Sequence, residues 1–140
     1  MKNLRSILFV VGALLMASVA QAQQAKVTAF VPFDFVIGDR AYSAGQYWLK
    51  SAGESNTLLE ISNDRNPGEV MVLSNSCETV LPSQQTKLVF RKMGENYFLS
   101  QVWVAGHLTG REFPRSRTEI RMAQNHEKAE TVIVAANLVK

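Results

Sequence analysis

Apolar and β-branched residues are densest in the segment KLVFRKMGENYFLSQVWVAG, residues 87–106. Two β-rich runs, Lys87–Met93 and Tyr97–Ala105, flank Gly94-Glu95-Asn96. This pattern predicts a hairpin with a three-residue loop in which Asn96 has a positive φ. Residues of equal parity then share a face, and both faces are mainly apolar. The even face has Leu88, Phe90, Phe98, Val102 and Val104, and the odd face has Val89, Met93, Tyr97, Leu99 and Trp103. We therefore expect this hairpin to be covered on both sides at the centre of the fold.

The segment Lys26–Ile37 alternates with a period of two, because all its odd positions are apolar. That period is typical of a half-buried strand. Pro32 has no N–H to donate, so the strand is predicted to lie at an edge or to be broken by a bulge. Gly38-Asp39 is predicted to be the turn that follows.

Further short strands are predicted between turn-rich segments. Polar or turn-forming residues separate most of them, and Asn63–Gly68 reads as a hairpin connection. The predicted strands are Gln46–Lys50, Thr57–Ser62, Glu69–Ser74, the short β-prone Cys77–Leu81, and a final strand Thr131–Leu138. Leu108–Pro114 is expected to be irregular.

One helix is predicted near the C-terminal end. Ser116 and Glu119 have the Ser-x-x-Glu spacing of a capping box, in which the serine oxygen accepts from the backbone N–H of Glu119 and the Glu119 side chain reaches back. Helix-forming residues continue to about Lys128, with Ile120, Ala123 and Met122 as a weak apolar stripe. The chain is thus predicted to be mainly β, an antiparallel β-barrel or β-sandwich of seven to nine strands with a helix over about 116–128. The successive hairpins favour the barrel.

The first 22 residues are predicted to be a signal peptide. Lys2 and Arg5 precede an uncharged apolar run, and Ala20-Gln21-Ala22 forms a small-x-small cleavage site. Residues 23–140 then form a single exported β-rich domain, periplasmic or secreted, with no transmembrane segment after cleavage; an uncleaved anchor is the alternative. Without Lys2 and Arg5 the net charge falls from +3 to about +1. Nucleic acid is therefore not an expected partner.

Cys77 is the only cysteine, so the fold contains no internal disulfide. A lone cysteine in a β-prone segment usually acts as a small buried hydrophobic residue. A reactive or intermolecular thiol is the alternative.

Three segments resemble a family of small exported proteins common in soil bacteria. They are VPFDFVIGDRAYSAGQYWLK (31–50), KLVFRKMGENYFLSQVW (87–103) and GREFPRSRTEIRMA (110–123), which match the pattern VPFxFxxGxxxxxAGxY, KLVFxxxGxxYFLxxVW and GRExPxSxxE. The resemblance spans nearly all of the chain after residue 22 and implies export and one β-rich domain. The family has no assigned activity, cofactor or catalytic residue, so the resemblance implies none here. Ser43 departs from the pattern, since relatives often have proline there, and would loosen the turn.

No motif in the chain indicates a reaction, a metal site or a cofactor. His107 and His126 are far apart in sequence and lack the close ligand pairs of metal sites. There is no Gly-x-Ser-x-Gly and no glycine-rich phosphate loop. Asp34 lies between two phenylalanines but is expected on the polar face of its strand.

Two groups of side chains are candidates for a ligand or partner surface. The basic cluster has Arg111, Arg115, Arg117 and Arg121, and the second group has the aromatics Tyr47, Trp48, Tyr97 and Trp103 together with His107. Solvated arginines and core aromatics are the alternatives. The function predicted is an exported non-catalytic β domain that binds a ligand or protein partner in the cell envelope. A small hydrolase using dispersed acids or His107 is the alternative.

Overall fold

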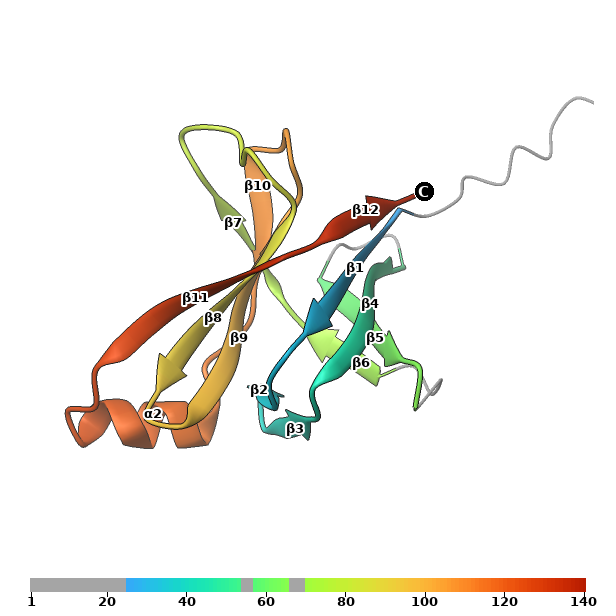
Figure 1. The fold of residues 1–140 in the computed structure, drawn as a ribbon. Helices are drawn as coiled ribbons and strands as arrows, with labels where there is room; N and C mark the ends of the chain where they lie inside the picture. Colours follow the sequence, from blue (N-terminus) through green and yellow to red (C-terminus); the bar gives the residue numbers. More distant parts are fainter. Residues whose placement is uncertain (1–24, 54–56, 66–69) are drawn as a thin grey trace, which may run out of the picture.

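The computed structural model describes residues 25–53, 57–65 and 70–140 (Figure 1). The predicted signal peptide, residues 1–22, lies outside the described residues, as do parts of the predicted connections Ser51–Asn56 and Asn63–Gly68.

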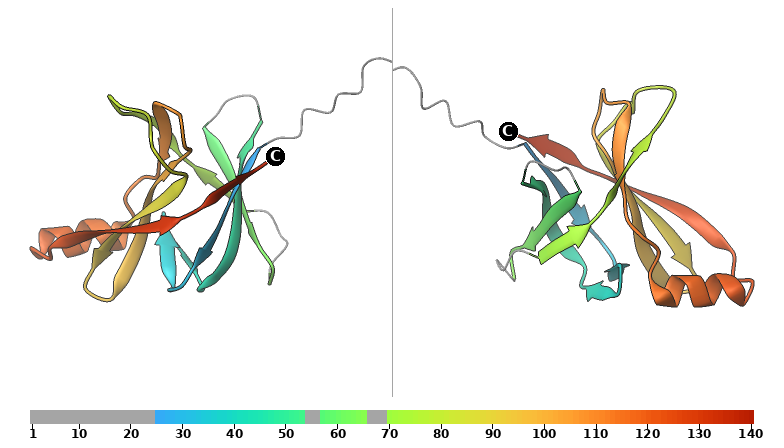
Figure 2. Two further views of the ribbon diagram at one scale, coloured as in Figure 1. Left: turned by 45° about the horizontal axis from the view of Figure 1, so that its top comes forward. Right: turned by 180° about the vertical axis from the view of Figure 1, so that it is seen from behind.

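The strands form two mainly antiparallel sheets that pack in a sandwich-like arrangement (Figures 1 and 2). The first sheet has the spatial order β12 (Asn137–Val139), β1 (Lys26–Val31), β4 (Gly45–Ala52), β5 (Leu58–Asn63) and β6 (Val70–Leu73). The second has the order β11 (Ala129–Ala135), β8 (Lys87–Met93), β9 (Asn96–Trp103), β10 (Thr109–Glu112) and β7 (Asn75–Glu78), and β2 (Phe35–Ile37) joins β9 to β3 (Arg40–Tyr42). The only helix in the described ranges is α2 (Arg117–Gln124).

The predicted mainly β fold with a helix near the C-terminal end is confirmed, and the architecture is the sandwich rather than the favoured barrel. The described residues form twelve strands, more than the seven to nine predicted, because bends divide the first and the last predicted strand and because β3 and β10 were not predicted. Four bends in all interrupt extended segments of the described chain. At each bend the chain passes from one sheet to the other. The bends lie at Pro32–Asp34, Ser43–Ala44, Ser74 and Ala136.

Hydrogen bonds hold these bends in place. Asp34 Oδ1 accepts from the backbone N–H of Ala44 at 2.8 Å, which joins the first two bends. Asp34 is exposed, as its predicted place on the polar face requires. Pro32 lies in the first bend, so the predicted break at this residue is confirmed. The predicted edge position is wrong, because β1 lies between β12 and β4.

The core lies between the two sheets and contains most of the residues that the alternation marks as inward. In the first strand segment Val27, Ala29, Val31, Phe35 and Ile37 are all buried, and Phe33 packs against them. Val27, Ala29 and Val31 come from the first sheet, and Phe35 and Ile37 come from β2 of the second. The second sheet also buries Leu88, Phe90, Leu99 and Val102 in the same cluster.

The β8–β9 hairpin forms as predicted, but its turn has two residues. Met93 pairs with Asn96, so Gly94 and Glu95 form the turn, and the positive φ of 58° falls on Gly94 instead of Asn96. A glycine at the first turn position is typical of the two-residue loops that match strand twist.

A bulge in β9 then changes which residues share a face. Leu88 pairs with Val102 but Phe90 pairs with Leu99, which leaves Ser100 as an extra residue. Leu99 therefore lies in the core with Phe90, and the prediction that Phe98 shares that face is wrong. Phe98 is buried outside this core cluster, so the hairpin is covered on both sides, as predicted.

The helix begins where the sequence indicates and ends earlier than predicted. Ser116 Oγ accepts from the backbone N–H of Glu119 at 3.0 Å, which confirms half of the capping box. The helix ends at Gln124, and His126 has a φ of 60°, which leaves the helical path. The predicted apolar stripe is wrong, because Ile120 and Ala123 are exposed while Glu119 is buried.

The predicted irregular segment Leu108–Pro114 contains β10. All four of its residues pair with β7, and Arg111 and Glu112 also pair with β9. Three of its four residues are polar, so periodicity did not reveal this strand. Its backbone hydrogen bonds come from partners that are distant in the sequence.

Candidate functional site

A hollow of about 710 Å³ lies beside the β7–β8 loop. A second hollow is a groove beside the β3–β4 bend, lined by aromatic and charged side chains. Its volume is about 530 Å³, within the range of roughly 300–1,000 Å³ typical of small-molecule sites. Residues 40–47 line one side, residues 61–65 of β5 and its continuation line another, and Phe30 of β1 and Val70 of β6 complete it. The groove therefore depends on the bend that moves the chain between sheets.

Aromatic rings lie beneath this groove. Tyr42 stacks on Phe35 with ring centroids 5.3 Å apart, and Tyr47 meets Phe35 edge to face at 5.0 Å. Tyr47 is buried, and its hydroxyl donates to the backbone carbonyl of Ser43 at 2.7 Å. These contacts attach the bend to the core.

The hydroxyl of Tyr42 is buried without a hydrogen-bond partner in the described structure. Burial raises the pKa of Tyr42 above its usual value, although the positive charge of Arg40 acts in the opposite direction. The hydroxyl therefore remains protonated at neutral pH. An unpaired buried hydroxyl costs about 1–3 kcal/mol, so this group is a hydrogen-bond donor in need of an acceptor.

The rim of the groove is polar and bears charges of both signs. Arg40, Asp64 and Arg65 are exposed there. Gln46, on β4 of the first sheet, also lines the groove, and its amide donates to Thr28 Oγ1 at 2.6 Å. The arrangement offers a floor of two nearly perpendicular tyrosine rings, Tyr42 and Tyr47, and a rim with two guanidinium groups and one carboxylate.

Of the residues predicted for a binding surface, only Tyr47 lines this groove. Trp48 lines a separate shallow hollow beside Lys50 and Glu60, which form an ion pair of 2.9 Å. Because neighbouring residues of a strand point to opposite faces, Tyr47 and Trp48 are separated by the sheet.

The other predicted aromatics have structural partners. Tyr97 stacks on Phe33 with centroids 3.8 Å apart, under Lys92 Nζ at 5.6 Å. Trp103 is buried, and its ring nitrogen donates to Gln101 Oε1 at 3.0 Å. These two residues support the hairpin and lie in different places from the groove.

His107 and the arginines also lie apart from the groove. His107 is an exposed loop residue. Arg111 is partly buried on β10, whereas Arg115 is exposed before the helix. Arg117 and Arg121 are exposed on α2, and the backbone N–H of Arg117 donates to Asp39 Oδ1 at 3.1 Å. The basic residues thus do not gather into one described site.

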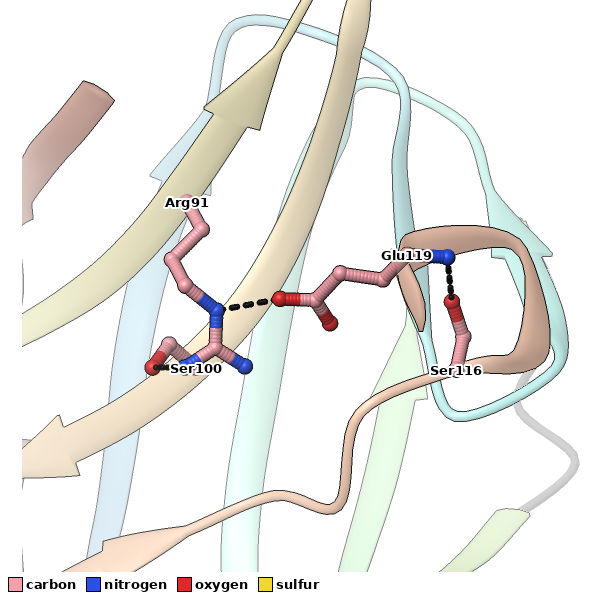
Figure 3. Close-up of polar contacts among 4 residues, drawn as sticks. All are labelled: Arg91, Ser100, Ser116 and Glu119. Atoms are coloured by element: carbon pink, nitrogen blue, oxygen red, sulfur yellow. Dashed lines mark hydrogen bonds and ion pairs between the residues drawn. The ribbon is translucent and has the colours of Figure 1, made fainter. Parts of the chain in front are cut away.

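A buried charged network beneath α2 has the residue types of an active site. Glu119 forms an ion pair with Arg91 Nε, Arg91 Nη1 donates to Ser100 Oγ at 2.8 Å, and Ser116 caps the helix (Figure 3). The Glu119 side chain is only 3% exposed. This network attaches the helix to the β8–β9 hairpin and explains why a charged residue replaces the expected apolar stripe.

Cys77 is partly buried in β7 and forms no disulfide. Burial raises the pKa of its thiol, and the nearby Glu112 carboxylate acts in the same direction. The thiol is therefore a poor nucleophile at neutral pH.

Among residues 25–53, 57–65 and 70–140, no three His, Cys, Asp or Glu side chains gather closely enough to hold a metal ion. In the same ranges, no helix has the length and apolar character needed to cross a membrane.

Most of the residues that line the groove are not marked by any pattern in the sequence. Phe30 was detectable, because it is a large aromatic at an even, outward position of an alternating strand. Arg40, Tyr42, Asp64 and Arg65 are turn-flanking residues with no distinctive spacing, and only the folded chain brings them together.

Comparison of the chain with protein-family models, curated proteins and solved structures found no match in any of the three.

Proposed function

We propose that the chain is an exported, non-catalytic β domain of the cell envelope that binds a small polar ligand in the groove beside the β3–β4 bend. The observation behind this proposal is the groove of about 530 Å³ with an aromatic floor and a charged rim. A mainly apolar floor with a few convergent polar groups is the usual composition of a ligand site.

The chemistry of the lining indicates the kind of ligand. A partly apolar group packs against the rings of Tyr42 and Tyr47, and its polar substituents reach the charged rim at Arg40 and Arg65. The unpaired hydroxyl of Tyr42 supplies a further donor if its ring turns toward the ligand. A ligand with acceptor oxygens and a negative charge therefore suits this groove best.

The alternative of a small hydrolase using dispersed acids or His107 has weaker support. Asp64 is the only carboxylate among the described residues that line the groove, and His107 does not line it. Acid–base hydrolysis normally needs two such groups close together.

Native mass spectrometry tests the proposal on protein isolated from the envelope of the cells that make it. We expect a chain beginning at residue 23, with a reproducible small-molecule adduct. Arg40→Ala with Arg65→Ala should remove the adduct, and Arg121→Ala, an exposed arginine on the helix, should retain it. An adduct that survives the groove substitutions would contradict the proposed site, and a protein-sized adduct would identify a protein partner instead.

If an adduct is found, Tyr42→Phe provides a finer test. This substitution keeps the ring and removes only the hydroxyl. Loss of a hydrogen bond to a ligand should weaken binding by about fivefold to tenfold, measured by titration with the identified compound. Unchanged affinity would show that the hydroxyl does not contact the ligand.

A further inference from the structure

Two loops lie side by side at the end of the second sheet opposite α2 (Figures 1 and 2). They are the β7–β8 loop, Thr79–Thr86, and the β9–β10 loop, Val104–Leu108. Three backbone hydrogen bonds join them: Thr79 N–H donates to Leu108 O at 2.9 Å, Gly106 N–H to Ser83 O at 2.8 Å, and Ser83 N–H to His107 O at 3.2 Å. We call this paired structure the two-loop tip.

The two-loop tip exposes three aliphatic side chains. Val80 is 94% exposed, Leu81 75% and Leu108 50%. Side chains with this exposure contribute little to the packing of the fold. Single exposed apolar residues are common on protein surfaces, but here two are consecutive, and the third lies on the loop hydrogen-bonded to theirs. A grouped apolar surface on an ordered projection indicates contact with another apolar phase.

The charge distribution supports the same conclusion. The two-loop tip contains no Asp, Glu, Lys or Arg, and its one histidine is His107. The charged residues Glu78 and Lys87 flank the β7–β8 loop in the sequence. Transfer of the tip from water to a medium of low dielectric constant would therefore bury no Asp, Glu, Lys or Arg.

The shape and side-chain types favour a lipid surface over a protein partner. Protein interfaces concentrate binding energy in Trp, Tyr and Arg that fill pockets, whereas the exposed tip side chains are aliphatic. The hollow beside the tip has five polar or charged lining residues, Thr79, Ser83, Gln84, Gln85 and Lys87, and three apolar ones, Leu81, Pro82 and Trp103. It is therefore no apolar socket for a protein side chain.

We propose that the two-loop tip docks on a lipid bilayer surface, with Val80, Leu81 and Leu108 inserted among the lipid acyl chains and Ser83, Gln84 and His107 at the headgroup level. The hydrogen bonds between the loops keep the N–H groups of Thr79, Ser83 and Gly106 and the carbonyl groups of Ser83, His107 and Leu108 paired on insertion. Since the tip has no Lys or Arg, binding does not require anionic lipid. Three short side chains offer less apolar surface than an acyl anchor, so binding is weak and reversible.

Co-sedimentation with vesicles tests this proposal. The chain from residue 23 onward is used, because it contains every described residue and lacks the apolar leader segment, which would bind lipid by itself. It is mixed with vesicles of phosphatidylcholine and with vesicles of equal parts phosphatidylcholine and phosphatidylglycerol. We expect similar binding to both and little change with salt. No binding to either vesicle, or binding only to anionic vesicles that salt abolishes, would overturn the proposal.

Two matched substitutions locate the contact. Leu81→Asp should lower the partition coefficient by about tenfold or more. Leu73→Asp makes the same change at a 62% exposed leucine of β6, in the other sheet. This control variant should keep a partition coefficient within about twofold of the wild-type value. Both positions are exposed, so both variants should retain the wild-type urea midpoint. Equal binding by the two variants would overturn the proposal.

Two further measurements separate insertion from other contacts. Tryptophan placed by Val80→Trp should shift its emission to the blue with phosphatidylcholine vesicles and be quenched by brominated acyl chains, after subtraction of the parent signal from Trp48 and Trp103. Absence of both changes would overturn insertion. Sedimentation velocity without lipid should show a monomer, and an oligomer that Leu81→Asp dissociates would show that a second copy covers the tip instead.

Discussion

The ion pair of Arg91 and Glu119 allows the sharpest stability prediction. It connects α2 to the central hairpin, and its side chains are 18% and 3% exposed. Removing one partner of a buried pair typically costs about 3–5 kcal/mol, because the remaining charge stays buried. For Glu119→Leu we expect the free energy of unfolding to fall by about 3 kcal/mol, the lower end of that range. Arg91 then still keeps its hydrogen bond to Ser100 Oγ at 2.8 Å and some contact with solvent.

Urea unfolding of residues 23–140, followed by fluorescence of Trp48 and Trp103, measures this loss. A domain of this size is typically stable by about 5–15 kcal/mol, so the variant should fold but with a clearly lower midpoint. Each kcal/mol corresponds to roughly 3–5 °C in Tm for about 120 residues, which predicts a decrease of roughly 10–15 °C. Glu130→Leu, the same change at an exposed position on β11, should stay within about 0.5 kcal/mol of wild type.

A double-mutant cycle isolates the pair itself. Arg91→Met alone should lower the free energy of unfolding by about 3–5 kcal/mol, because it leaves the more deeply buried carboxylate of Glu119 without a counter-charge. Arg91→Met with Glu119→Leu should cost less than Arg91→Met alone, since no unpaired charge remains. The reasoning would be refuted by a Glu119→Leu cost below about 1 kcal/mol, or by a double variant whose loss equals the sum of the single losses.

Four further predictions concern separate features. Tyr42→Phe removes an unpaired buried hydroxyl and should raise the free energy of unfolding by up to about 1 kcal/mol in urea titrations; a loss of that size would show that the hydroxyl is paired. Gly110→Ala should lower the free energy of unfolding by about 1–3 kcal/mol, because the added Cβ would lie 2.7 Å from the ring of Trp103. An unchanged free energy of unfolding would show that the ring moves away freely. Burial raises the pKa of Cys77, so its rate of alkylation by iodoacetamide should rise at higher pH than in the urea-unfolded chain, and a lower midpoint in the native chain would contradict this. Ile120→Lys should change stability by less than about 0.5 kcal/mol, since Ile120 faces solvent; a loss above about 1 kcal/mol would mean that it packs inward.

Prediction from the sequence worked best where neighbouring residues specify the structure. The inward residues of the first strand, the position of the β8–β9 hairpin and the serine cap of α2 were predicted correctly. Each depends on residues a few positions apart, through alternation, turn propensity or a local hydrogen bond.

The errors arose where a distant partner decides the outcome. Ile120 looks like the inward residue of a weak helical stripe, yet Glu119 is buried because Arg91, on another strand, supplies its counter-charge. Phe98 and Leu99 exchange faces because Ser100 is an extra residue in β9, and nothing in the local pattern indicates that bulge.

The amino-acid sequence by itself determined a β-rich chain with one capped helix, because periodicity and turn chemistry act over a few residues. Only the tertiary structure decided where four extended segments bend between sheets, and the bend at Ser43–Ala44 lines the groove. It also paired the two loops that present Val80, Leu81 and Leu108 together. Both surfaces combine side chains from segments that meet only after long-range strand pairing, so no short pattern in the sequence encodes them.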